Sequence, residues 1–108
     1  MSSDVNATLG LLRELMRLDR GMSLREAVAL LTVGLHPGLS LSELAWELDE
    51  PPYSASRAVS ALAGAGAEGL VRVATFDANR RIRQVFPTAE GRRLLERWGI
   101  ATPGRHAA

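Results

Sequence analysis

Apolar residues recur at helical spacing along most of the chain, and the first such segment spans residues 4–20. It carries two apolar stripes, whereas a helix that covers one core needs only one. The first stripe holds Val5, Leu9, Leu12 and Met16, and the second holds Leu11, Leu15 and Leu18. We expect the first stripe to cover the chain's own domain and the second to form a homodimer with another copy. A single broad contact inside one monomer is the alternative.

The second helical segment begins at Ser23, where Glu26 three residues later completes a capping box. Its apolar residues surround the helix almost completely. They are Leu24, Ala27, Val28, Leu31 and Leu35 on the main side, with Leu30 and Val33 on the other. A helix that is apolar all round is typical of a buried position. We therefore expect a central, buried helix that ends at His36-Pro37-Gly38.

Residues 40–62 predict two short helices joined by a tight turn. Ser40 and Glu43 form a second capping box, and Asp49 suits the turn because Asp tolerates a left-handed backbone. Pro52 suits the first position of the following helix, where its missing N–H costs nothing. That helix runs to about residue 63 and turns small apolar residues inward, namely Ala55, Ala58, Val59 and Leu62. The pair predicts a helix-turn-helix, whose second helix can enter a DNA major groove.

Two β-rich segments follow at residues 70–76 and 81–87, with residues 77–80 as the turn between them, and they predict a hairpin. Thr88 then begins a last helix that runs to about Trp98. The expected fold is mainly α with a β-hairpin wing, a winged helix-turn-helix. We expect an N-terminal dimerisation helix at residues 1–22, a winged helix-turn-helix domain at 23–99 and a disordered tail at 100–108.

The composition fits one domain and argues against several classes of function. The 108 residues include no Cys, and all 13 basic residues are Arg, so there is no Lys. Disulfides, thiolate metal sites and phosphate loops that need a Lys are thereby excluded. The two His, at positions 36 and 106, are too far apart for a metal site, and no motif spacing supports a nucleophile. We expect a cytoplasmic protein that is not an enzyme, with no metal, no cofactor and no membrane segment.

Charge is distributed unevenly along the chain, although the formal net charge is only +1. Residues 1–50 carry four Arg and eight acidic residues, a balance of −4. Residues 51–108 carry nine Arg and four acidic residues, a balance of +5. This asymmetry is typical of a protein with one side toward an anion. Chance partition over a solvated surface is the alternative.

The outer face of the second motif helix carries the candidate DNA contacts. Arg57 can take a guanine edge with two hydrogen bonds or bind a phosphate. The hydroxyls of Ser54, Ser56 and Ser60 suit phosphates or bases, and Tyr53 suits a phosphate or a sugar. Ordinary surface or packing roles remain the alternative for each of these side chains.

The predicted hairpin adds a basic cluster that consists of Arg80, Arg81 and Arg83. Arg72, on the preceding strand, is a further candidate for a phosphate contact. A narrow minor groove attracts Arg side chains, but charged residues on an edge strand also protect a sheet against aggregation.

Acidic residues around the motif turn oppose DNA binding. Glu47, Asp49 and Glu50 repel phosphates unless their side chains turn away from the groove. Trp46 lies on the outer side of its helix, and we expect it to pack against another helix of the same domain or else to anchor an interface. These residues keep open an alternative function, a winged-helix adaptor or inhibitor that binds another regulatory factor rather than DNA.

Four segments together resemble the MarR family of bacterial transcription regulators over about residues 23–98. They are HPGLSLSELAWEL, SASRAVSAL, Asn79-Arg80-Arg81 in the wing and Thr88-Ala89-Glu90-Gly91 at the last helix. The resemblance implies a homodimeric regulator that binds double-stranded DNA at two half-sites. It also implies that Arg80 or Arg81 enters the minor groove while the second motif helix occupies the major groove.

The sequence departs from the family pattern at the motif turn, where Asp49, Glu50 and Pro51 replace the usual Gly, apolar residue and Ser. Pro87 replaces a usual Leu, and about three extra residues precede the wing. The terminal helices are shorter than those from which family members build a dimer and a ligand pocket. Sensing of a small-molecule effector therefore does not follow from the resemblance.

Overall fold

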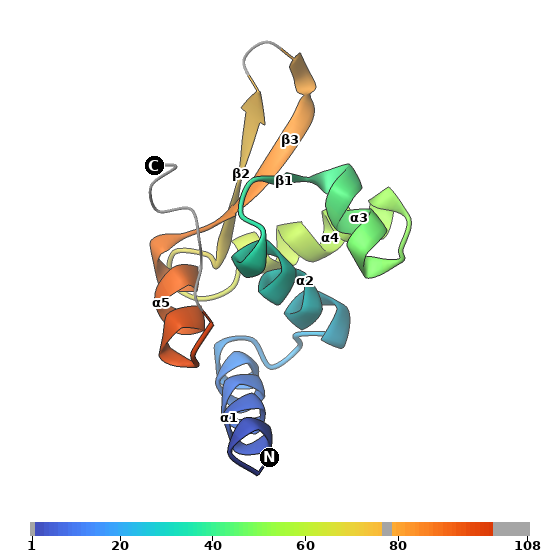
Figure 1. Ribbon diagram of the computed structural model, residues 1–108. Coiled ribbons are helices and arrows are strands. Elements are labelled where there is room, and N and C mark those ends of the chain that lie inside the picture. Colours follow the sequence, from blue (N-terminus) through green and yellow to red (C-terminus); the bar gives the residue numbers. More distant parts are fainter. Residues whose placement is uncertain (1, 77–78, 101–108) are drawn as a thin grey trace.

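The computed structural model describes residues 2–76 and 79–100, with side chains described for residues 5–75 and 82–100 (Figure 1). Its helices are α1 (Ser2–Leu18), α2 (Leu24–Leu35), α3 (Leu41–Leu48), α4 (Pro52–Ala63) and α5 (Ala89–Arg97). Its strands are β1 (Leu39–Ser40), β2 (Val71–Phe76) and β3 (Asn79–Pro87). The order of these elements confirms the expected winged helix-turn-helix. In Figure 1 the β2–β3 hairpin projects from one end of the molecule and α1 from the other.

The helix starts follow the expected capping chemistry. The Ser23 hydroxyl accepts the N–H of Glu26, and the Ser40 hydroxyl accepts the N–H of Glu43, each at 3.0 Å. In both boxes the Glu carboxylate accepts a hydrogen bond from the backbone N–H of the capping Ser. Asp49 ends α3 with φ 55° and ψ 44°, which confirms the left-handed turn. The turn at Asp49 redirects the chain from α3 into α4.

The sheet has three antiparallel strands in the order β1-β3-β2, which confirms the hairpin and adds one strand. Leu39 of β1 pairs with Val85 of β3, and Val73 of β2 pairs with Val85 from the other side. Two residues are too few to show a periodicity, so β1 was not expected. Strand β3 begins at Asn79, two residues earlier than predicted. The turn residues 77 and 78 lie outside the described residues.

The core lies between α2, α4, α5 and the base of the sheet. Its fully buried side chains come from every layer and include Leu30, Leu44, Leu62, Leu70, Val85 and Leu95. Helix α5 reaches the sheet closely at Gly91, where an added Cβ would lie 2.1 Å from the carbonyl oxygen of Leu70. Most of the predicted tail, residues 101–108, lies outside the described residues. Ile100 packs partly buried against the core, contrary to the expected disorder.

Helix α2 is central but is not buried all round. Its buried residues are Ala27, Ala29, Leu30, Val33 and Gly34. Three residues of the expected main stripe are exposed instead, namely Leu24 at 75%, Val28 and Leu35. The prediction of a wholly buried helix is therefore wrong, because only the side toward α3, α4 and α5 is covered.

The two stripes of α1 are exchanged relative to the expectation. Leu11 and Leu15, expected at a dimer interface, are only 5% and 2% exposed within the monomer, and Leu18 is partly buried against the same core. The first stripe is the exposed one, from Val5 at 65% to Met16 at 56%, with Leu9 and Leu12 between. Periodicity shows that both stripes exist. It does not show which of them the rest of the chain covers.

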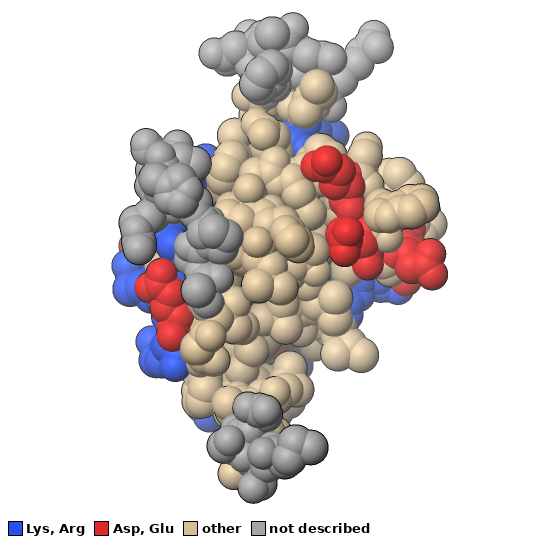
Figure 2. Space-filling view, in the orientation of Figure 1, with Lys and Arg blue, Asp and Glu red and all other residues tan. Residues whose placement is uncertain are grey.

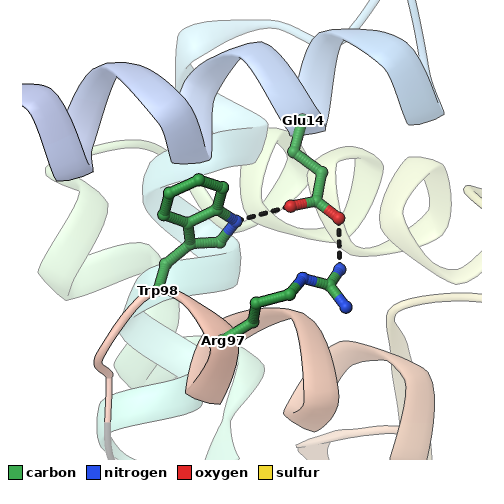
Figure 3. Close-up of polar contacts among 3 residues, drawn as sticks. All are labelled: Glu14, Arg97 and Trp98. Atoms are coloured by element: carbon green, nitrogen blue, oxygen red, sulfur yellow. Dashed lines mark hydrogen bonds and ion pairs between the residues drawn. The ribbon is translucent and has the colours of Figure 1, made fainter.

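A polar contact with α5 sets the rotation of α1 (Figure 3). One carboxylate oxygen of Glu14 accepts the indole N–H of Trp98 at 2.5 Å, and the other accepts a hydrogen bond from Arg97. Gly10, one turn earlier, lies against the Trp98 ring, and a Cβ there would come within 2.5 Å of it. With Gly10 and Glu14 turned toward α5, the stripe of Leu11 and Leu15 points into the core.

Candidate nucleic-acid interface

An open groove of about 700 Å³ runs between α3, α4 and strand β3. The residues that line it are Gly38, Ser40, Leu41, Ser42, Glu43, Pro52, Tyr53, Ser56, Ile82, Arg83 and Gln84. The first turns of both motif helices border this groove, and the positive end of a helix dipole favours anions. The one acidic side chain in the lining, Glu43, accepts the backbone N–H of Ser40 at 2.8 Å. This hydrogen bond holds the Glu43 carboxylate at the start of its own helix.

Tyr53 and Arg57 form a pair on the outer face of α4. A guanidinium nitrogen of Arg57 donates to the Tyr53 hydroxyl at 3.0 Å, and the guanidinium lies over the ring, 5.4 Å from its centroid. Tyr53 is 69% exposed despite this contact. The pair therefore holds two donors together at the surface of the motif helix.

The three candidate Ser residues of α4 are separated by the structure. Ser56 lines the main groove, and Ser60 is exposed one turn farther along the helix. Ser54 lines a second groove of about 390 Å³, which it shares with Ser23 and Arg25 at the start of α2. Tyr53 borders both grooves. The outer face of α4 is therefore continuous with the first turn of α2, which sequence reasoning did not include.

The wing contributes Arg83 to the main groove. Arg72 lies opposite Phe86 in the β2–β3 register, and its guanidinium stands 4.6 Å from the centroid of the Phe86 ring. Arg80 and Arg81 belong to β3 near the tip of the hairpin, where Phe76 pairs with Asn79. Their side chains lie outside the described residues, so their part in a basic cluster stays a prediction.

The acidic residues of the motif turn are not equivalent. Glu50 forms an ion pair with Arg25 of α2 at 3.3 Å, which neutralises its charge. Glu47 and Asp49 are exposed. Arg25 lies far from Glu50 in the sequence, and no spacing rule marks it as the partner. The pair was therefore missed, and it reduces the expected conflict with phosphates by one charge.

Trp46 does not pack against another helix, which corrects the more favoured expectation. Its side chain is 83% exposed, because α3 turns Leu44 and Ala45 inward and Trp46 away from the core.

Within the described residues, no group of three or more His, Asp or Glu side chains is placed to hold a metal ion. Among the helices of that same part of the chain, none is long and apolar enough to cross a membrane.

Comparison with known proteins gives a consistent picture of the fold. No protein-family model matches the sequence, and a search of curated protein sequences finds no match. The structure of FabT from Streptococcus pneumoniae in complex with DNA matches with a TM-score of 0.63 at 20% identity, covering 91% of this chain and 76% of FabT. A crystal structure of MarR matches with a TM-score of 0.64 at 22% identity, covering 90% of this chain and 73% of that chain.

The MepR–DNA complex of S. aureus matches with a TM-score of 0.66 at 15% identity, covering 87% of this chain and 74% of MepR. RV1404 from Mycobacterium tuberculosis matches with a TM-score of 0.67 at 18% identity, and this chain covers 64% of it. The resemblance seen in the sequence motifs is therefore matched by structural neighbours that are MarR-family regulators. The chain has the winged helix-turn-helix fold of those regulators.

Proposed function

We propose that this protein is a sequence-specific regulator of transcription that binds double-stranded DNA. The observation that carries the proposal is the groove between the motif helices and β3, bordered by the exposed Tyr53–Arg57 pair and by Arg83. Helix α4 would enter the major groove, and the wing would follow the minor groove or the backbone. FabT and MepR, which share the fold, were crystallised with DNA.

The candidate side chains divide into those that would read DNA bases and those that would bind phosphates and so position the protein on the duplex. Arg57 is the candidate for a base edge, since a guanidinium can donate two hydrogen bonds to guanine. Ser56, Ser60 and the Tyr53 hydroxyl suit phosphates, which set the register of a protein on the duplex. Arg72, Arg80, Arg81 and Arg83 would neutralise phosphates or enter a narrow minor groove. Ser54 would contribute only if DNA reaches the second groove beside Arg25.

A homodimer is the second part of this proposal. The exposed stripe of α1, which holds Val5, Leu9, Leu12 and Met16, continues into an apolar groove of about 360 Å³ beside Leu24 of α2. Burial of such a stripe against a second copy would remove apolar surface from water. The symmetry of a dimer would place two recognition helices about 34–36 Å apart, one turn of DNA. The candidate interface thus moves from Leu11, Leu15 and Leu18 to the other side of α1.

Selection of bound sequences from a random pool of double-stranded DNA tests the proposal. We expect enrichment of an inverted repeat whose half-sites are about one helical turn apart. A single enriched site without symmetry would contradict the dimer but not the binding of DNA. A pool that stays random after several rounds would contradict sequence-specific binding itself.

The alternative function is an adaptor that binds another regulatory factor in place of DNA. The exposed Trp46 favours it, because large aromatic side chains that stand bare on a surface often anchor protein interfaces. The adaptor predicts DNA affinity that is weak and independent of Arg57. Titration of any DNA binding against salt separates the two functions, because phosphate contacts make affinity fall steeply as salt rises.

A further inference from the structure

Trp46 is the most exposed of the large apolar side chains in the described part of the chain, at 83%. Helix α3 does not need this indole for its own packing, because Leu44 and Ala45 cover the core. Burial of an indole removes a large apolar area from water, and a bare one marks a surface that something else can cover. Trp46 belongs to neither of the two grooves described above.

Acidic residues lie near Trp46 along the chain. Glu47 follows Trp46 directly, and Asp49 lies one turn after it. Glu43 lies one turn before it, but its carboxylate accepts the Ser40 N–H and borders the main groove. All three are exposed, and in the described part of the chain no Arg lies within ion-pair distance of them. The backbone of Asp49 is held in the left-handed turn by N–H bonds to the carbonyls of Ala45 and Trp46. Figure 2 shows acidic residues gathered along the α3 side of the molecule.

We propose that Trp46, Glu47 and Asp49 form a docking surface for an Arg-bearing segment of another protein. A guanidinium can lie flat on an indole face while its N–H groups donate to neighbouring carboxylates. The same carboxylates repel nucleic acid and anionic lipid, so a cationic polypeptide is the occupant that this charge favours. The surface is separate from the Tyr53–Arg57 face, and it would serve a partner that binds alongside DNA rather than in place of it.

Binding of a dye-labelled synthetic peptide tests the surface. The probe is a short helical peptide with Arg at every third or fourth position, compared with the same peptide carrying Glu. We expect the Arg peptide to bind the intact protein at low salt and the Glu peptide not to bind. Trp46→Ala should weaken the Arg peptide about tenfold, since it removes the aromatic anchor. Glu47→Arg should weaken it at least as much.

Glu68→Arg is the matched control, because Glu68 is an exposed acid in the loop between α4 and β2, away from α3. It makes the same change of charge as Glu47→Arg and should alter the affinity for the Arg peptide less than about twofold. Equal losses of affinity in Glu47→Arg and Glu68→Arg would mean that peptide binding depends only on the net charge of the protein, which overturns the proposal. An affinity unchanged by Trp46→Ala would overturn it as well.

Two further measurements on Trp46→Ala exclude other occupants. The variant should keep the DNA affinity and the salt dependence of the unmodified protein. A loss comparable to that of Arg57→Ala would assign Trp46 to the DNA interface and end the proposal. Its mass by light scattering should also be unchanged, whereas a smaller assembly would show that the occupant is a second copy. Binding of the Arg peptide does not depend on DNA binding, so the two proposals can fail separately.

Discussion

The Tyr53 hydroxyl and ring hold the guanidinium of Arg57 at the surface of α4, an arrangement that suits the DNA contact proposed for Arg57. A side chain that is already ordered loses less conformational entropy when it binds. We expect Arg57→Ala to weaken binding to the selected DNA site by about 1–3 kcal/mol and to relax sequence preference. Fluorescence anisotropy with selected and scrambled duplexes measures both effects.

Arg93→Ala is the control for Arg57→Ala, since Arg93 is an exposed Arg on α5, outside both grooves. It removes the same charge and should lower affinity for both duplexes slightly and equally. If Arg57→Ala behaves like this control, Arg57 contributes only general electrostatic attraction.

The Arg25–Glu50 ion pair predicts a compensating effect between two residues. Arg25→Ala should weaken DNA binding more than loss of a surface charge explains, because it leaves the Glu50 carboxylate unpaired beside the α4 face. Glu50→Gln should have little effect alone and should restore much of the affinity of Arg25→Ala. A double-mutant cycle in DNA affinity measures the coupling, and we expect about 0.5–1 kcal/mol for so exposed a pair. Strictly additive losses would contradict the role of Arg25 as a shield for Glu50.

Single residues were predictable from the sequence where their role is local. The capping boxes at Ser23 and Ser40 and the left-handed Asp49 depend on neighbours within a few positions, and all were expected. The partner of Glu50 and the exposure of Trp46 depend on how α2 and α3 pack, which no local pattern encodes. The same limit applies to Ser54, whose place beside Arg25 follows from the crossing of α2 and α4.

The contact between α1 and α5 rests on the charge of Glu14. Partial burial pushes the pKa of Glu14 upward, but hydrogen bonds from Trp98 and Arg97, with the charges of Arg97 and Arg17, outweigh it. The pKa in the folded protein therefore lies below the ordinary value of 4.5. The carboxylate form stabilises the fold, fully so above the pKa of the unfolded chain. This contribution is lost as the pH falls through the lowered pKa of the folded state.

Glu14→Gln tests this contact because Gln keeps an acceptor for the Trp98 indole but has no charge for Arg97. We expect the free energy of unfolding to fall by about 1–2 kcal/mol at neutral pH. This is less than the roughly 1.5–3 kcal/mol typical of a hydrogen bond to a charged group, because Arg97 is largely exposed to solvent. The difference from the unmodified protein should shrink toward zero as the pH drops below the pKa of Glu14. Urea titrations at several pH values measure it, with Glu68→Gln as a control that should show no such trend. A difference that is constant with pH would contradict the role of the charge.

Whole elements were more predictable than the faces they present. All five helices and both hairpin strands were expected near their observed bounds, because caps, Gly and Pro residues mark their ends. The two-residue β1 was missed, since its pairing with β3 depends on residues more than forty positions away. For α1 the sequence shows two stripes, but the contacts of Gly10 and Glu14 with α5 decide which stripe is buried. Such contacts are visible only once the fold is known.

At the scale of the whole molecule, charge and apolar surface are arranged on separate sides. The α4 face and Arg83 of the wing border the main groove. Trp46, Glu47 and the α3 cap Asp49 lie outside that groove, and the exposed apolar stripe lies on α1. The hairpin and α1 project from opposite ends in Figure 1. A contact through α1 would therefore leave the α4 face and the wing of each copy free. This separation is what a dimeric DNA-binding protein requires.

The stripe of α1 carries the last prediction. We expect the protein to be a dimer at micromolar concentration and Leu9→Glu to convert it to a monomer, because a buried carboxylate without a partner is costly at an interface. Leu9 is exposed in the monomer, so the fold itself should tolerate the change. Light scattering measures the mass, and circular dichroism checks that the helices remain.

Leu35→Glu is the matched control for Leu9→Glu, since Leu35 is also exposed but lies at the end of α2 opposite Leu24. It should leave both the dimer and DNA binding intact. The monomeric Leu9→Glu variant should still bind a single half-site weakly but lose most of its affinity for the inverted repeat, because the two half-sites are then bound independently. A monomeric unmodified protein, or a dimer that survives Leu9→Glu, would show that the stripe of α1 is not the interface.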